Sequence, residues 1–184
     1  MYTASHKRKE NIAEYLLYMW QIEDIIRAND LDIDKIKQNV IDKYPSLTEL
    51  QRKEMTEWYE SLIDMMRREG IEKSGHLQLN KNVILQLVDL HLALQKDPRF
   101  ADYTAEFYKT LPYIVELRSK SGEEKPGEIE TCFNALYGML MLRLQNKEVS
   151  PATQHAVIQI SKFIALLARN FHLDEQDKLF PHND

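Results

Sequence analysis

The chain has 184 residues, of which 43% are apolar and 29% charged, and this balance excludes a disordered or low-complexity polypeptide. It contains only 5 Gly and 6 Pro, about half the usual share, which indicates a helical protein. The net charge is −5, with acids and bases interspersed. A duplex binder needs several cations on one face, so no nucleic-acid partner is expected.

Three helices are predicted in the first part of the chain. The segment from Lys7 to Ala28 has apolar residues at helical spacing on two faces, which is typical of a central helix. The next helix, Asp32 to Tyr44, has one narrow apolar stripe and is expected on the surface. A capping box at Ser46 and Glu49 begins the third helix, which is expected to end at Gly70.

Four further helices are predicted after this point. Their expected bounds are Asn80 to Lys96, Arg99 to Ser119, Glu128 to Asn146, and Ser150 to Phe171. Pro112 lies inside the second of these four segments and removes one backbone hydrogen bond from it. The third and fourth segments, like the first helix of the chain, carry enough apolar residues to form the core.

These elements predict an all-α protein with a single helical domain over residues 1–184. Because the connections are short, the helices are expected to form an antiparallel bundle of about six to seven members. The segment 119–127 contains turn formers and charged residues but no apolar residue, so it is expected to be a surface loop. Residues 173–184 are expected to be a short tail. Gly138 falls inside a predicted helix, where it indicates a close contact with another helix.

The location expected from the sequence is the cytoplasm. The apolar stretch after the amino terminus is interrupted by acids and lacks the core of a signal peptide. The longest uncharged run, Thr131 to Leu142, is too short to cross a bilayer, so no membrane association is expected. The single cysteine, Cys132, cannot form an intrachain disulfide and reads as a small buried apolar residue.

Motifs typical of metal sites and of common enzymes are absent from the sequence. There is no Glu-x-x-His pair, no Gly-rich phosphate loop and no Cys-x-x-Cys pair. Asp30, Asp32 and Asp34 have the alternate spacing of calcium ligands, but Lys35 and Ile41 stand where such a loop needs Gly and Glu. A helix cap is the simpler interpretation, and neither a metal nor a cofactor is predicted.

Polar residues on faces that ought to be buried are the remaining candidates. Glu23 lies on the apolar stripe of the first helix, next to Asp24, and a buried carboxylate needs a partner. Arg27 follows one turn later, and Arg143 is embedded in an apolar helix. The simpler interpretation is a salt bridge that fixes the helix register.

A second hypothesis places these residues around a polar pocket between the first and sixth predicted helices. Its candidate ligand-binding residues are Glu23, Asp24, Arg27, His91, Tyr137 and Arg143. An anionic ligand would be held there by Arg143. For His91, which is flanked by Leu87 and Leu94, the simpler interpretation is a hydrogen-bonded core histidine.

Two segments, YLLYMWQIEDIIRA from Tyr15 to Ala28 and ETCFNALYGMLMLRL from Glu130 to Leu144, carry a family resemblance. They resemble signatures of a bacterial family of about this length that is catalogued as a domain of unknown function. The resemblance implies an all-helical cytoplasmic protein and covers nearly the whole chain. It singles out the two helices that hold most of the candidate residues, and it implies no activity.

Two functions are compatible with these observations. The first is a non-enzymatic interaction or scaffold protein that binds a protein partner or forms a homodimer through an apolar helix face. The alternative is a small-molecule binding protein, or an unrecognised enzyme, that uses the polar pocket.

Overall fold

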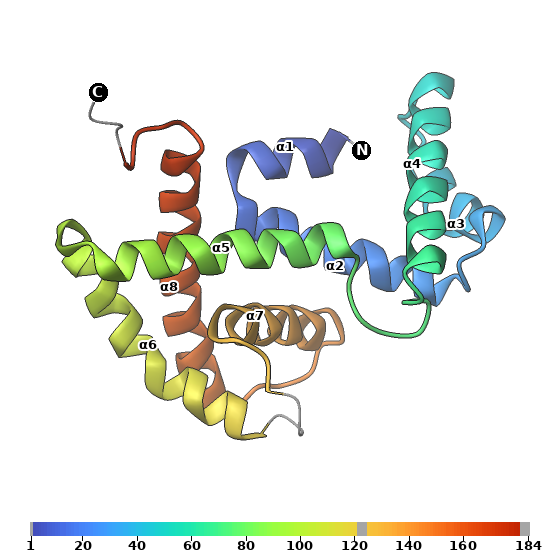
Figure 1. Ribbon diagram of the computed structural model, residues 1–184. Helices are drawn as coiled ribbons and strands as arrows, with labels where there is room; N and C mark the ends of the chain where they lie inside the picture. Colours follow the sequence, from blue (N-terminus) through green and yellow to red (C-terminus); the bar gives the residue numbers. More distant parts are fainter. Residues whose placement is uncertain (1, 121–124, 181–184) are drawn as a thin grey trace.

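The computed structural model describes residues 2–120 and 125–180, and in these ranges the chain forms α-helices, short 3₁₀ turns and no strand (Figure 1). The all-α prediction is confirmed. The helices are α1 (Tyr2–Glu10), α2 (Ile12–Ala28), α3 (Ile33–Asn39), α4 (Glu49–Arg68), α5 (Gln78–Lys96), α6 (Ala101–Lys120), α7 (Glu128–Leu144) and α8 (Pro151–Asp174), with the 3₁₀ helices η1 (Ile41–Lys43) and η2 (Pro98–Phe100).

The helix count is slightly above the expected number because Asn11 divides the amino-terminal segment. Its backbone is extended, and its side chain accepts hydrogen bonds from the amides of Ala13 (3.0 Å) and Glu14 (3.2 Å). These bonds cap α2, and α1 becomes a separate helix. The prediction of one helix from Lys7 onward is therefore wrong at this residue, because the side chain of Asn11 caps α2 and the charged residues before it end α1.

The start of α4 differs from the expected one by two residues. Thr48 caps the helix, with Gln51 as its reciprocal partner, in place of the expected pair Ser46 and Glu49. Both pairs have the spacing of a capping box, so the sequence alone does not separate them. The start of α8 is as predicted, because Ser150 is its N-cap and Pro151 its first residue.

The connection between α4 and α5 contains two glycines with positive φ. Gly70 (φ +66°) ends α4 as expected, and Gly75 (φ +92°) turns the chain just before α5. Residues that have a Cβ atom rarely adopt these backbone angles. The connection can therefore fold back tightly over α2, where it contributes to the site described below.

The core lies around α8, which packs against α2, α5, α6 and α7. Figure 1 shows α5 crossing α8, with α7 below α5 and α6 beside α8. Large side chains from several helices are almost completely enclosed there: Leu16, Trp20, Leu87, Phe133, Phe163 and Leu167. Burial of this apolar surface is the main force that holds the helices together.

At one side of the molecule, α3 and α4 pack on the carboxyl end of α2, apart from α6 and α8 (Figure 1). Tyr59 and Met66 of α4 are buried in this contact. Arg67 donates a hydrogen bond to the carbonyl of Leu31 over 3.0 Å. Asp32 caps α3, which is the role expected for the three aspartates.

The expected loop and tail are described only in part. Residues 121–124 of the loop and 181–184 of the tail lie outside the described residues. Helix α8 extends to Asp174, and beyond it Leu179 is buried while Phe180 contacts Phe100, with ring centroids 5.5 Å apart. The described part of the tail therefore packs on the helices.

Gly138 does not make the close helix contact expected of it. A methyl group placed on its α-carbon would have no neighbour within 4 Å. Glycine destabilises the interior of a helix, and a close contact with another helix often accounts for its presence there. Gly138 instead lies on the exposed side of α7.

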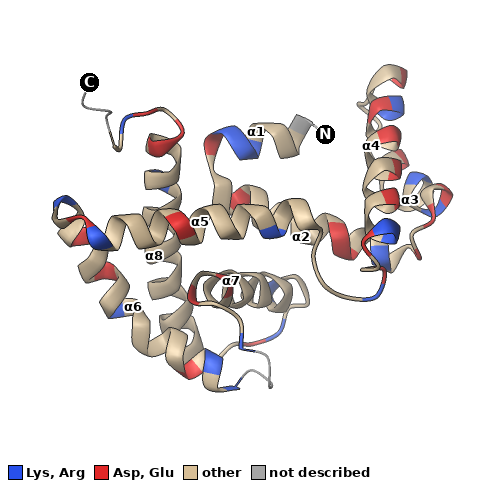
Figure 2. Cartoon of the chain, viewed as in Figure 1, with Lys and Arg blue, Asp and Glu red and all other residues tan. Residues whose placement is uncertain are grey.

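Charges of both signs alternate over α3 and α4, whereas α7 is nearly free of charge along its length (Figure 2). In residues 2–120 and 125–180, no helix combines the length and the apolar character that a membrane span requires.

Candidate functional site

Glu23 is completely buried, and its carboxyl group is bound by residues at the start of α5. Its oxygen Oε1 accepts hydrogen bonds from the amide of Leu77 (2.9 Å) and from Nδ2 of Asn80 (2.7 Å). Its other oxygen lies 2.6 Å from Nδ1 of His76. A buried carboxyl group with partners on both oxygens fixes the position of the chain that supplies them. Glu23 thus ties the α4–α5 connection to α2.

Asp24 and Arg27 form a second set of contacts beside Glu23. Oδ1 of Asp24 lies 2.9 Å from Nη1 of Arg27, and Oδ2 accepts a hydrogen bond from the hydroxyl of Tyr137 over 2.6 Å. Arg27 also donates to the carbonyls of Ile71 and Gly75. Burial and the bond to Asp24 raise the pKa of Tyr137. These contacts join α2 and α7 to the connection.

Aromatic rings cover this polar cluster. The rings of Trp20 and His76 are stacked, with centroids 4.0 Å apart and planes inclined by 12°. Tyr137 and Phe133 from α7 meet Trp20 edge-on, at 5.6 and 6.2 Å. Such stacked and edge-on pairs hold the rings in fixed orientations.

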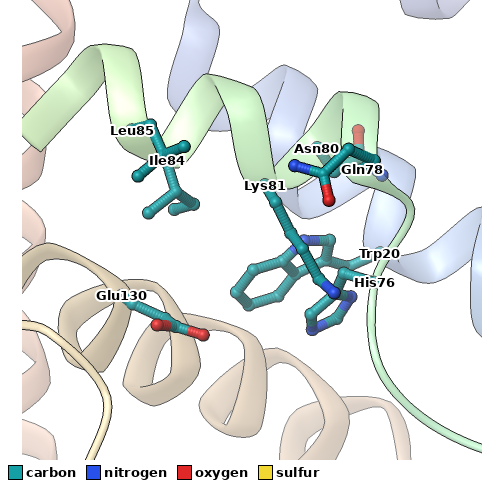
Figure 3. Close-up of a pocket in the computed structure, with 8 residues that line it drawn as sticks. All are labelled: Trp20, His76, Gln78, Asn80, Lys81, Ile84, Leu85 and Glu130. Atoms are coloured by element: carbon teal, nitrogen blue, oxygen red, sulfur yellow. The ribbon is translucent and has the colours of Figure 1, made fainter.

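A pocket of about 270 Å³ opens beside the stacked rings, between α5 and α7 (Figure 3). Its residues are Trp20, His76, Gln78, Asn80, Lys81, Ile84, Leu85 and Glu130. Two atoms of these residues are buried without a hydrogen-bond partner among the described residues: Nε1 of Trp20 and Oδ1 of Asn80. An unpaired buried group of this kind costs about 1–3 kcal/mol.

Four of the six predicted ligand-binding residues, Glu23, Asp24, Arg27 and Tyr137, lie together in this cluster. The expected local salt bridge is present between Asp24 and Arg27, whereas Glu23 pairs with neither Arg27 nor Arg143. His76 occupies that place beside Glu23.

His91 lies elsewhere, in the core. Its Nδ1 is 2.7 Å from the hydroxyl of Tyr103, and its ring meets Phe107 and Phe163 edge-on. Burial lowers its pKa from the ordinary 6.5 to about 4. His91 is therefore the hydrogen-bonded core histidine of the simpler interpretation.

Arg143 also lies outside the cluster, at an apolar groove formed by α2, α7 and α8, which we call the α7 groove. Its volume is about 540 Å³. The apolar residues that line it are Ala13, Leu17, Leu136, Met139, Leu140, Val157, Ile158, Ile164 and Ala165, and the charged ones are Glu14, Arg143 and Lys162.

Three members of the polar cluster could not be found from the sequence: His76, Gly75 and Asn80. They lie about 50 residues from Glu23 along the chain. Their segment has no periodicity that points to a site. The described residues hold no group of three or more His, Cys, Asp or Glu side chains placed to bind a metal ion.

The fold and this cluster define an all-α protein whose polar centre is enclosed by α2, α5 and α7. The chain belongs to a family described as a domain of unknown function, DUF4924, whose sequence model matches residues 1–178. The resemblance found in the two helical segments is thereby confirmed. No curated protein and no solved structure matches the chain.

Proposed function

We propose that this protein is a non-enzymatic interaction module of the cytoplasm that forms a homodimer through the α7 groove. One observation carries the proposal, the incomplete burial of the carboxyl-terminal half of α7. Leu140, Met141 and Leu142 are only half-buried, and Leu144 is 63% exposed. A helix that is apolar on all sides is normally enclosed by protein.

The surface beside α7 extends this apolar area. Ile158 of α8, which lines the groove, is 54% exposed. Contiguous exposed apolar surface of this kind marks a site of protein association. A helix or ridge of a partner would bury it, in the manner of other helix-and-groove interfaces.

The charges at the rim favour a second copy of the chain as the partner. Glu14 lies on the α2 side of the groove, and Arg143 lies on the α7 side. Arg143 has no ion pair among the described residues, whereas Glu14 is paired only with the nearby Lys7. A two-fold axis parallel to the groove would bring each side of it against the opposite side of the other copy, so that Glu14 of each copy faces Arg143 of the other.

The polar cluster supports a non-enzymatic interpretation. Glu23 has no exposed surface, and its carboxyl group accepts hydrogen bonds from Leu77 and Asn80 and contacts Nδ1 of His76, which holds the α4–α5 connection. Arg27 also holds this connection, because it donates hydrogen bonds to two of its backbone carbonyls. These residues are used to position the chain.

The proposed location is supported by Cys132. The side chain is completely buried, and burial raises the pKa of its thiol to about 12. With no second cysteine, the sequence has no intrachain disulfide of the kind common in oxidising compartments.

Sedimentation velocity over a concentration series tests the proposal. We expect a dimer at about 100 µM protein, which corresponds to an association free energy of about −5.5 kcal/mol or stronger. Ile158→Lys and Leu144→Lys should each weaken association about tenfold or more, because they place an unpaired charge in the apolar contact. Both residues are exposed in the single chain, so circular dichroism should show an unchanged helix content.

The matched control is Leu50→Lys on α4, where the leucine is 65% exposed but lies far from the groove. This variant should dimerise as the wild type does. A wild-type chain that stays monomeric over the whole series, or a Leu50 variant that is equally affected, would contradict the proposal.

A further inference from the structure

The pocket beside Trp20 and His76 is separate from the α7 groove and has the features of a small-ligand site. Its volume of about 270 Å³ is smaller than that of pockets for drug-sized ligands. Trp20, Ile84 and Leu85 give it apolar walls. The pocket therefore suits a compact molecule with an apolar part.

Two opposite charges face this pocket from different helices. Figure 3 shows Lys81 on α5 and Glu130 on α7, on opposite sides. Neither side chain has an ion pair or hydrogen bond among the described residues, although many other charged side chains of the protein do. An unpaired positive charge and an unpaired negative charge thus lie at opposite sides of one apolar pocket.

We propose that this pocket binds a small apolar zwitterion, of the chemical class of an α-amino acid. The carboxylate of such a ligand would pair with Lys81, its ammonium group with Glu130, and its side chain would contact Ile84 and the aromatic wall. A simple anion would leave Glu130 without a partner, and a simple cation would leave Lys81 without one. The inference goes beyond the proposed dimer and does not depend on it.

The buried unpaired atoms of the wall are an independent observation in favour of a ligand. Nε1 of Trp20 is a donor without an acceptor, and Oδ1 of Asn80 is an acceptor without a donor. Trp20 is 2% exposed and Asn80 is completely buried. Natural cores rarely leave such atoms unpaired, so this wall contains polar groups whose partners are missing.

The polar cluster makes the wall rigid before any ligand binds. His76 is held by Glu23 and stacks on Trp20, while Asn80 donates to the same carboxyl group. Trp20, His76 and Asn80 therefore lose little freedom on binding, which favours affinity for a small molecule.

Titration of the full-length chain with L-leucine and L-phenylalanine tests the inference. In a Trp58→Phe background Trp20 is the only tryptophan, so its fluorescence reports binding in the pocket. Isothermal titration calorimetry on the wild type gives the same affinity without relying on that variant. We expect saturable binding of at least one of the two, and binding about tenfold weaker or worse for 3-phenylpropanoate, 4-methylpentanoate and the matching amines, which each lack one charge.

Lys81→Gln and Glu130→Gln should each weaken amino-acid binding about tenfold or more. Lys96→Gln on the same helix and Glu148→Gln after α7 are matched controls, and both should bind as the wild type does. The inference is overturned if neither amino acid gives a saturable signal up to about 10 mM. It is also overturned if the one-charge analogues bind equally well, or if the Lys81 and Glu130 variants bind like their controls.

Discussion

At the scale of single residues, Glu23 shows how far a sequence can indicate a buried polar group. Its place on an apolar stripe predicts burial and the need for a partner. The partners themselves, His76 and Asn80, come from a connection that the sequence pattern does not relate to α2. Contacts between distant segments depend on how helices pack, and helical periodicity carries no information about them.

Replacing Glu23 should destabilise the protein strongly. Glu23→Ala leaves the amide of Leu77, Nδ2 of Asn80 and Nδ1 of His76 without their partner and creates a cavity, so we expect the free energy of unfolding to fall by about 3–5 kcal/mol. Urea denaturation measures this change. Glu14→Ala on the same helix removes an exposed pair with Lys7 and should cost about 1 kcal/mol or less. Equal effects of the two variants would show that Glu23 does not hold the α4–α5 connection.

His91 should make the stability of the protein depend on pH. Its pKa is about 4 in the folded protein and 6.5 without burial, so between these values the unfolded chain binds a proton that the folded protein does not. Stability is therefore fully present above about pH 6.5 and falls as the pH decreases to 4. The groups facing His91 are the hydroxyl of Tyr103 and the carboxyl group of Glu128, whose nearest oxygen is 3.9 Å from Nε2.

The measurement is the free energy of unfolding at pH 7 and pH 4.5 for the wild type and for His91→Gln, which stays neutral. We expect the wild type to lose roughly 2.5 kcal/mol more than the variant over this range, at about 1.4 kcal/mol per pKa unit. Equal losses in the two proteins would mean that His91 is protonated inside the fold.

At the scale of helices, most elements follow from apolar periodicity and capping residues. The start of α8 at Pro151 and the end of α4 at Gly70 are as predicted. The errors fall where two caps compete, as at Ser46 and Thr48, or where a capping residue separates a charged segment from an apolar one, as at Asn11. Small differences in hydrogen bonding decide such ends, and spacing alone does not resolve them.

Gly138 provides a test at this scale. Gly138→Ala should raise the free energy of unfolding by about 0.5–1 kcal/mol, because alanine loses less backbone freedom in a helix and the added methyl group meets no neighbour. Thermal unfolding measures the change. Gly70→Ala is the matched control and should destabilise the protein, since its φ of +66° is unfavourable for alanine. A destabilised Gly138 variant would mean that this side of α7 is in close contact with protein.

At the scale of the whole molecule, the fold class follows from composition and periodicity, whereas the surfaces that matter for function do not. The sequence marks α7 as apolar on several sides and therefore as a core helix. Only the packing of α2 and α8 shows that its carboxyl-terminal half is left partly open. The α7 groove and the pocket beside Trp20 and His76 both exist because the neighbouring helices leave parts of these helix faces uncovered.

Amide hydrogen exchange of the wild-type chain at two protein concentrations, below and above the dissociation constant of the dimer, tests the central proposal most directly. Residues 139–144 of α7 and 154–162 of α8 should exchange more slowly at the higher concentration, because a second copy covers the α7 groove. Exchange in α4, which lies away from the groove, should be the same at both concentrations. Unchanged exchange at the groove, or slowing confined to another helix, would show that the protein does not dimerise through this surface.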